Sequence, residues 1–284
     1  MATTEITTPP GDAKPTAATK PEPRREGTIV AGLREAGELT EFYGRAMVSL
    51  PGTLRYTSEI LRQTAILIRG TTVLMFFLSA FLGISVVNFA FFFLRSIGAS
   101  DFTGAATGFA NPLLGATLMF GYVFTAKVCC GMVAELGAMK IQQEIDALDS
   151  TGVDPMRYVV GTRLLAVLLY IPIGGTVALL GATAGSYFVG VVVLQGVGSE
   201  AFLQINWAVQ PLQVQVNSLI TQGAIAMVTS VVACFYGLRT KGGPAAVGDS
   251  VARSLIANLV LVHLIAGFLV VFFYGTELLM PIGG

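Results

Sequence analysis

The chain has 284 residues, of which 54% are hydrophobic and only 12% are charged, and its mean hydropathy is +0.72. Soluble globular proteins carry about 25% charged residues, so this chain has too few to cover a surface that faces water. The same figures exclude a disordered chain, and three cysteines exclude a disulfide-rich scaffold. The 17 basic residues are balanced by 17 acidic ones, which argues against a nucleic-acid partner. The class that remains is an integral membrane protein.

Composition divides the chain into three parts. Residues 1–28 are rich in Pro, Thr, Ala, Lys and Glu and predict a disordered cytoplasmic tail. No apolar stretch lies near Met1, so we expect no cleaved signal peptide. Residues 29–70 form an amphipathic region, and residues 71–284 form the membrane domain.

The amphipathic region predicts a helix at the membrane interface. Apolar side chains recur at helical spacing between positions 33 and 54, with charged residues between them. Pro51-Gly52 is expected to interrupt this helix, and a second piece runs over about 55–69. A helix of this kind directly before a span favours the interface. The alternative is a soluble helix that packs on a cytoplasmic partner.

Five apolar runs predict an all-α fold with about five transmembrane helices, because about 20 residues cross a ~30 Å hydrocarbon core. The runs cover approximately 71–94, 109–133, 161–194, 216–238 and 255–276. The third run would reach about 51 Å as a helix. We expect one tilted helix there, kinked at Pro172, rather than two spans.

The positions of the basic residues predict how the chain is oriented in the membrane. All of the 17 Lys and Arg residues except Arg95 fall within or next to the segments 1–70, 134–160 and 239–253. Because cytoplasmic loops are enriched in Lys and Arg, these segments are expected in the cytoplasm, together with the N-terminus. The loops 95–102 and 195–214 and the C-terminus are then expected outside.

Most catalytic and ion-coupling chemistry is missing from the sequence. There is no G-x-x-x-x-G-K-[ST] loop for nucleotide phosphates, and the one histidine, His263, lies inside the fifth span. Cys129-Cys130 are interpreted as packing residues rather than metal ligands. Apart from His263, the spans offer neutral polar groups such as Asn88 and Asn217, and Lys127 lies near a cytoplasmic end, where it can reach the interface. We therefore expect no enzyme, no cofactor and no metal in this chain, and an apolar solute.

The cytoplasmic segment 134–160 carries five acidic and two basic residues, whereas the other cytoplasmic parts are basic. Ile141, Ile145 and Leu148 stand at helical spacing and predict a short helix with one apolar ridge between carboxylates. Gly152 is expected to end this helix, and Asp154-Pro155 to begin the third span. A partner that moves such a helix would move the second and third spans. The alternative is an ordinary loop.

This segment resembles the MlaE/YrbE family of ABC-type lipid permeases. The chain matches the family's approximate pattern at Ala134, Glu135, Leu136, Gly137, Met139, Ile141, Ile145, Asp146, Ala147, Leu148, Gly152, Asp154, Pro155, Val160, Arg163 and Ala166. It departs from the pattern at Gln143, where the family usually has an acid, and at Thr162, where it usually has Pro.

A second block, residues 236–254, resembles the second cytoplasmic loop of the actinobacterial YrbE permeases of Mce systems. The residues that carry this likeness are Arg239, Gly242, Gly243, Pro244 and Arg253. Together the two blocks and the spans extend the resemblance over about residues 33–276.

The resemblance implies a transport subunit of the inner (plasma) membrane. The short helix would be the coupling helix that docks on a separate cytoplasmic ATPase, which binds the ATP. The implied coupling residues are Glu135, Glu144, Ile145, Asp146, Ala147, Leu148, Gly152, Asp154 and Pro155. A second YrbE-type permease, identical or paralogous, would complete the membrane core, and MCE-domain proteins would deliver a lipid from outside. Import of fatty acids, mycolic-type lipids or sterols is the implied direction and cargo.

A lipid cargo needs an apolar conduit. Moving about 15 methylenes into water costs on the order of 12 kcal/mol at ~0.8 per methylene. Phe76, Phe77 and Phe81 are candidate conduit residues, although lipid-facing or packing roles are the simpler interpretation for most phenylalanines of the first span. Two other functions stay open: a stand-alone secondary transporter or channel, and a membrane anchor that does not transport.

Overall fold

The computed structural model describes residues 28–195 and 197–275, and these residues form helices and connecting turns without a strand. The chain divides into two compact units, one up to Glu38 and one from Leu39 onward, so the boundary lies inside the first helix. The predicted tail 1–28 lies, except for its last residue, outside the described residues. Within the first unit, Arg34 Nε lies 3.2 Å from Glu38 Oε1.

Five helices are long and apolar enough to cross a membrane, which confirms the predicted all-α membrane fold. The first comprises α1 (Thr28–Thr53), a 3-10 turn (Leu54–Tyr56) and α2 (Thr57–Ser96). The others are a chain of segments from α3 (Thr103–Ala110) through η3 (Asn111–Gly115), α4 (Ala116–Val123) and η4 (Phe124–Cys129) to α5 (Cys130–Ile141); η5 (Met156–Gly161) with α7 (Thr162–Tyr187) and η6 (Phe188–Val193); α9 (Leu212–Leu238); and α10 (Pro244–Tyr274). The remaining elements are the 3-10 turn η2 (Ser100–Phe102), directly before α3, and two short helices, α6 (Glu144–Ser150) and α8 (Ser199–Ala208).

The second long helix contains two π-helical segments, η3 and η4. Pro112 lies at the start of η3 and has no backbone N–H, which favours a wider turn. The hydroxyl of Thr117 donates to the carbonyl oxygen of Pro112 at 2.7 Å and satisfies that acceptor. The third span is one continuous helix in which Pro172 lies inside α7, as the single-span prediction required.

Three predicted boundaries differ from the structure. Pro51 lies inside α1, and the break falls at 54–56, after which α2 runs without interruption into the first span. Local proline chemistry disfavours a helix there, but Thr53, two residues later, is buried and bonds to the carbonyl oxygen of Arg157, which ties this part of α1 to the bundle. The second span begins at Ser100 rather than near 109, and the predicted outer loop 195–214 contains α8. Short amphipathic segments such as α8 carry a weak periodic signal.

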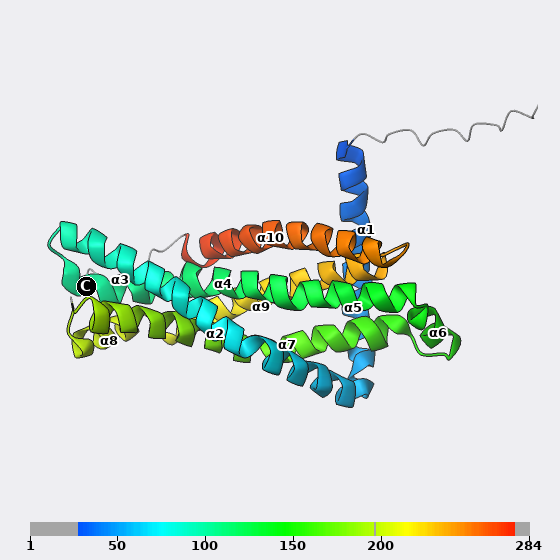
Figure 1. Ribbon diagram of the computed structural model, residues 1–284, viewed down its shortest axis with the longest axis horizontal. Coiled ribbons are helices and arrows are strands. Elements are labelled where there is room, and N and C mark those ends of the chain that lie inside the picture. Colours follow the sequence, from blue (N-terminus) through cyan, green and yellow to red (C-terminus); the bar gives the residue numbers. More distant parts are fainter. Residues whose placement is uncertain (1–27, 196, 276–284) are drawn as a thin grey trace, which may run out of the picture. The chain divides into compact units, whose positions relative to one another are not determined.

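Helices α2 and α7 run alongside each other through the bundle (Figure 1). Glycines allow this close approach, because a Cβ atom on Gly83 would collide with the backbone of Ala182, and one on Gly185 with the backbone of Ala80. Small residues at such crossings bring helix backbones into direct van der Waals contact, which is a main source of helix association in membranes.

Residues 39–53 of α1 pack on the bundle. Phe42 and Ala46 are buried against Val160 and Phe235, and the rings of Phe42 and Phe235 meet edge to face at 5.7 Å. Thr53 donates from Oγ1 to the carbonyl oxygen of Arg157 at 3.2 Å. Only part of the apolar arc is used in this way, since Val48 is 82% exposed and Leu54 is exposed. The exposed arc is compatible with the membrane interface, and that position stays a prediction.

The glycine contacts give a test of the α2–α7 packing. We expect Gly83→Val to lower the free energy of unfolding by about 3 kcal/mol or more, because the added atoms strike backbone that cannot move aside. The measurement is thermal unfolding of the purified chain in detergent. The matched control is Gly267→Val in α10, where a Cβ atom meets nothing within 4 Å. Equal losses in both variants would show that the close approach is not what the glycine provides.

Candidate functional site

The predicted short helix exists as α6, between the end of α5 and the start of η5. It lies at the same end of the bundle as the turn between α9 and α10, whereas α3 and α8 lie at the opposite end (Figure 1). The two segments that the sequence predicts to be cytoplasmic therefore lie at one end of the bundle.

Backbone geometry fixes both ends of α6. Gln143 precedes it with φ 60°, and Gly152 follows it with φ +79°, a conformation that glycine adopts without a steric cost. Asp154 then accepts the backbone N–H of Met156 at Oδ1 (2.9 Å) and pairs through Oδ2 with Arg157 Nε at 3.1 Å. The predicted helix stop at Gly152 and cap at Asp154 are thus both present.

The two sides of α6 differ. Ile145 is only 7% exposed, and Leu148 is half-buried against the cluster that contains Val160 and Leu164. These residues were expected on the docking surface, but the structure turns their side chains inward, where they anchor the helix. The outward residues are Glu144, Asp146, Ala147 and Asp149. The surface that α6 offers to a partner is therefore acidic rather than apolar.

Lys140, in the last turn of α5, connects α5 to α6 through an ion pair. Its Nζ lies 2.8 Å from Oδ1 of Asp146, across the sharp turn at Gln142-Gln143. Asp146 is thus partly neutralised, and Glu144 and Asp149 carry the remaining negative charge of the outward side. Periodicity did not reveal Lys140, because its partner lies beyond a helix break.

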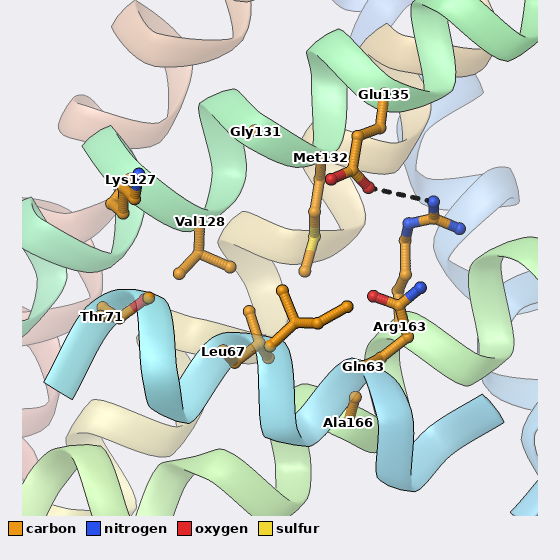
Figure 2. A pocket seen from close by; sticks show the side chains of 12 residues that line it. Gln63, Leu67, Thr71, Lys127, Val128, Gly131, Met132, Glu135, Arg163 and Ala166 are labelled. Atoms are coloured by element: carbon orange, nitrogen blue, oxygen red, sulfur yellow. Dashed lines mark hydrogen bonds and ion pairs between the residues drawn. The ribbon is translucent and has the colours of Figure 1, made fainter. Parts of the chain in front are cut away.

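A pocket of about 240 Å³ opens beside α5 (Figure 2). Lys127 lies at one end of it, and Glu135 and Arg163 lie at the other, with Leu67, Val128 and Met132 between them.

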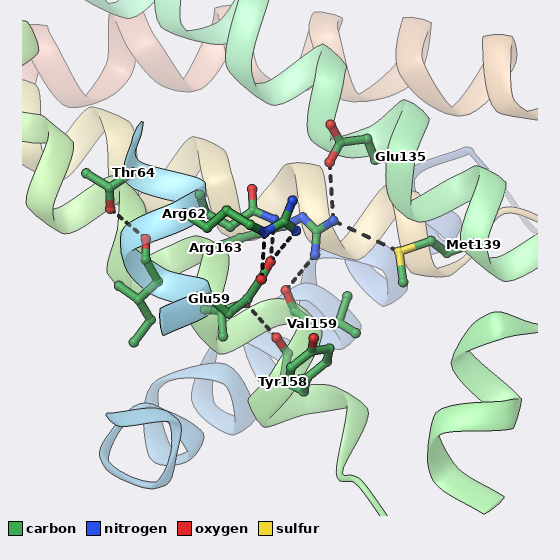
Figure 3. A network of polar contacts seen from close by, with 11 residues as sticks. Glu59, Arg62, Thr64, Glu135, Met139, Tyr158, Val159 and Arg163 are labelled. Carbon is green, nitrogen blue, oxygen red and sulfur yellow. Dashed lines mark hydrogen bonds and ion pairs between the residues drawn. The ribbon is translucent and has the colours of Figure 1, made fainter. Parts of the chain in front are cut away.

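Arg163 is the central polar group at this end of the bundle (Figure 3). Its side chain is 10% exposed, and its NH2 group lies 3.2 Å from Glu135 Oε2, while NH1 donates to the carbonyl oxygen of Val159 at 3.0 Å. Glu135 itself is 61% exposed. Glu135 was predicted as a coupling residue, and the structure gives it a definite contact: it joins α5 to α7 through a buried guanidinium.

The second of these predicted cytoplasmic segments, the turn between α9 and α10, packs on α5. Thr240 is buried and donates to Ser250 Oγ at 2.9 Å, and a Cβ atom on Gly137 of α5 would press against Thr240 and Val247. The guanidinium of Arg239 lies over the ring of Phe235 at 4.7 Å. Of the other predicted loop residues, Gly242 has φ +116°, Gly243 and Pro244 begin α10, and Arg253 is exposed.

An apolar groove of about 730 Å³ lies between α2 and the segments α3, η3 and α4. Phe89 and Phe93 line it together with Leu114 and Met119. Phe76, Phe77 and Phe81 are exposed on α2 but do not line this groove. The position of a phenylalanine along α2 decides on which face of the helix it lies. The sequence did not show which face of α2 borders the groove.

His263 is held at the edge of the same groove. Its Nε2 lies 2.7 Å from the hydroxyl of Tyr122, a groove residue, and its Nδ1 lies 2.8 Å from the carbonyl oxygen of Leu259. Both ring nitrogens are therefore bonded, which confirms its interpretation as a satisfied helix-contact residue.

Residues 60–272 match the family described as Permease MlaE. The chain belongs to the MlaE permease family. A probable ABC transporter permease protein of Rickettsia conorii is 24% identical over 243 residues, which cover 84% of this chain and 91% of that protein.

Two further relatives match shorter stretches. A probable ABC transporter permease protein of Synechocystis is 29% identical over 175 residues, 58% of this chain and 65% of that protein. The chloroplastic protein TRIGALACTOSYLDIACYLGLYCEROL 1 of Arabidopsis thaliana is 26% identical over 167 residues, 58% of this chain and 45% of that protein.

In this MlaE-family chain the pair Arg163–Glu135 gives an asymmetric prediction. Arg163→Ala should lower the free energy of unfolding by about 3 kcal/mol, since it removes a buried guanidinium and leaves the Val159 carbonyl without its donor. Glu135→Gln should cost only about 1 kcal/mol, because the carboxylate is largely exposed and an amide oxygen still accepts. Thermal unfolding of the two purified variants measures the difference. Equal costs would contradict the burial-based account.

The end of α6 gives a second prediction. Gly152→Ala should lower the free energy of unfolding by about 1 kcal/mol, because alanine pays a steric cost at positive φ. No atom lies within 4 Å of an added Cβ there, so the loss would reflect backbone conformation alone. Hydrogen exchange should also speed up over α6 in this variant. Gly267→Ala, at a helical glycine with open space, serves as the control and should be neutral or stabilising.

Proposed function

We propose that this chain is the permease subunit of an ATP-driven lipid transporter, and that the outward side of α6 docks on the ATPase. Membrane subunits of ABC transporters are transport components whose ATPase is carried by a separate chain, and this chain is such a permease by family. ATP would therefore bind on the partner.

The observation that carries the proposal is the construction of α6. The helix is anchored inward by Ile145, bounded by Gly152 and Asp154, and exposes Glu144 and Asp149. A force applied to such a helix passes directly to α5 and α7, because the Lys140–Asp146 and Glu135–Arg163 pairs tie those helices together.

A lipid cargo is supported by the groove beside α2. Its volume falls within the range of about 300–1,000 Å³ that is typical of small-molecule sites, and its lining is almost entirely apolar. A second permease subunit, the same chain or a paralogue, would cover the exposed apolar faces in the inner membrane. MCE-domain proteins on the outer side would deliver fatty acids, mycolic-type lipids or sterols for import, with the N-terminus in the cytoplasm.

Charge reversal tests the docking surface. The double variant Glu144→Lys with Asp149→Lys should weaken association with the ATPase by about tenfold or more, because like charges opposed across an interface cost several kcal/mol. Co-purification of the two chains from membranes measures this. Glu200→Lys, on α8 at the other end of the bundle, is the matched control. Undiminished association of the double variant would remove α6 from the interface.

Reconstitution separates this function from the stand-alone transporter. With the ATPase and a second permease in liposomes, lipid movement should require ATP hydrolysis. Uptake by this chain alone under an ion gradient, without nucleotide, would instead establish secondary transport.

A further inference from the structure

The C-terminal end of α1 packs tightly on η5, the segment that follows α6 in the chain. Thr53 is buried, and its Oγ1 donates to the carbonyl oxygen of Arg157 at 3.2 Å. A Cβ atom on Gly161 would strike the hydroxyl of Thr53, and one on Gly52 would meet the side chain of Arg157 at 3.2 Å. The two glycines therefore allow direct contact between η5 and the end of α1.

Arg157 connects this contact to α6. Its Nε lies 3.1 Å from Oδ2 of Asp154, whose Oδ1 accepts the backbone N–H of Met156. Asp154 stands two residues after Gly152, where the chain leaves α6. One ion pair and one hydrogen bond thus lead from the end of α6 through Arg157 to Thr53, so a displacement of α6 acts on the end of α1.

A break in the helix separates α1 from α2. The 3-10 turn covers Leu54–Tyr56, and Tyr56 has φ −101° and ψ 40°, outside the helical region. The rings of Tyr56 and Tyr158 meet edge to face at 5.1 Å, so the break also lies against η5. Residues at the ends of elements absorb the change in backbone angles when one element turns against another. The break therefore allows the end of α1 to follow η5 without bending α2.

The junction between α1 and α2, residues 52–56, leads to the helix that borders the apolar groove. α2 begins at Thr57, directly after the junction, and contributes Phe89 and Phe93 to the groove lining. A separate connection reaches α2 from α7 at the crossing of Gly83 and Gly185. Two connections therefore run from α6 to α2, one through α7 and one through the junction.

We propose that Thr53 is a positioning residue for transport, because its bond to Arg157 makes the junction move together with α6. Binding of ATP on the partner is thereby converted into movement at the start of α2. This inference rests on the proposed function, since it requires an ATPase that moves α6, and it adds the end of α1 to the elements that receive that movement.

The test is hydrogen exchange of the full chain in complex with its ATPase, measured with and without a non-hydrolysable ATP analogue. In the unmodified complex, nucleotide should change the exchange rates of both α6 and the junction, the latter by about fivefold or more, the lower end of typical coupling factors between two sites. A role of Thr53 in packing alone would not make exchange at the junction depend on nucleotide.

Two pairs of variants assign the effect to the contact with η5. Thr53→Val keeps most of the side-chain shape but removes the donor, whereas the control Ser49→Ala removes a buried hydroxyl that bonds within α1, to the carbonyl oxygen of Ala46 at 2.7 Å. Gly52→Leu displaces the side chain of Arg157, whereas its control Gly44→Leu adds atoms to α1 where a Cβ meets nothing within 4 Å.

Thr53→Val and Gly52→Leu should abolish the nucleotide response of the junction, leave that of α6 in place and leave co-purification with the ATPase unchanged. Both controls should respond as the unmodified complex does. If nucleotide does not alter exchange of α6 in the unmodified complex, the proposed docking on α6 is wrong and this inference falls with it. If α6 responds but the junction does not, or if the junction still responds in Thr53→Val and Gly52→Leu, the proposed function stands and this inference alone is overturned.

Discussion

The buried guanidinium of Arg163 joins α5 and α7, the helices that precede and follow α6 in the chain. Arg163 reaches from the start of α7 to Glu135 of α5 and to the Val159 carbonyl one turn away. Because burial makes an unpaired charge costly, these contacts hold α5 and α7 in one arrangement at this end of the bundle. The short helix α6 depends on that arrangement, since both of its ends are extensions of the helices that Arg163 connects.

Different interactions hold the helices together near α6 and at the crossing of α2 and α7. Near α6, charged and capping side chains fix the backbone, and the outward carboxylates are exposed. Farther along, α2 and α7 are held by direct backbone contact at Gly83 and Gly185, and Ser186 Oγ of α7 donates to the Gly83 carbonyl oxygen at 3.0 Å. No charged residue lines the apolar groove beside Phe89 and Phe93, which is consistent with lipid transport.

Much of the fold was predictable because membrane insertion imposes strong composition rules. The five spans, the short acidic helix, its glycine stop and its Asp154 cap all follow from local signals of hydropathy and turn chemistry. Less predictable were the uninterrupted passage through Pro51, the helix α8 and the ion pair between Lys140 and Asp146. The helix near Pro51 and the Lys140–Asp146 pair involve contacts with distant residues or across a helix break, whereas α8 is too short to give a clear periodic signal.

The sequence by itself determined that the chain is helical, that it lies in a membrane and that an acidic helix separates its second and third spans. It determined these because apolar length and capping residues act over only a few neighbours. The tertiary structure alone decided which side of α6 faces outward, that Glu135 meets Arg163, and which phenylalanines of α2 line a groove. Those properties depend on how one helix is rotated against another, and no local pattern records that rotation.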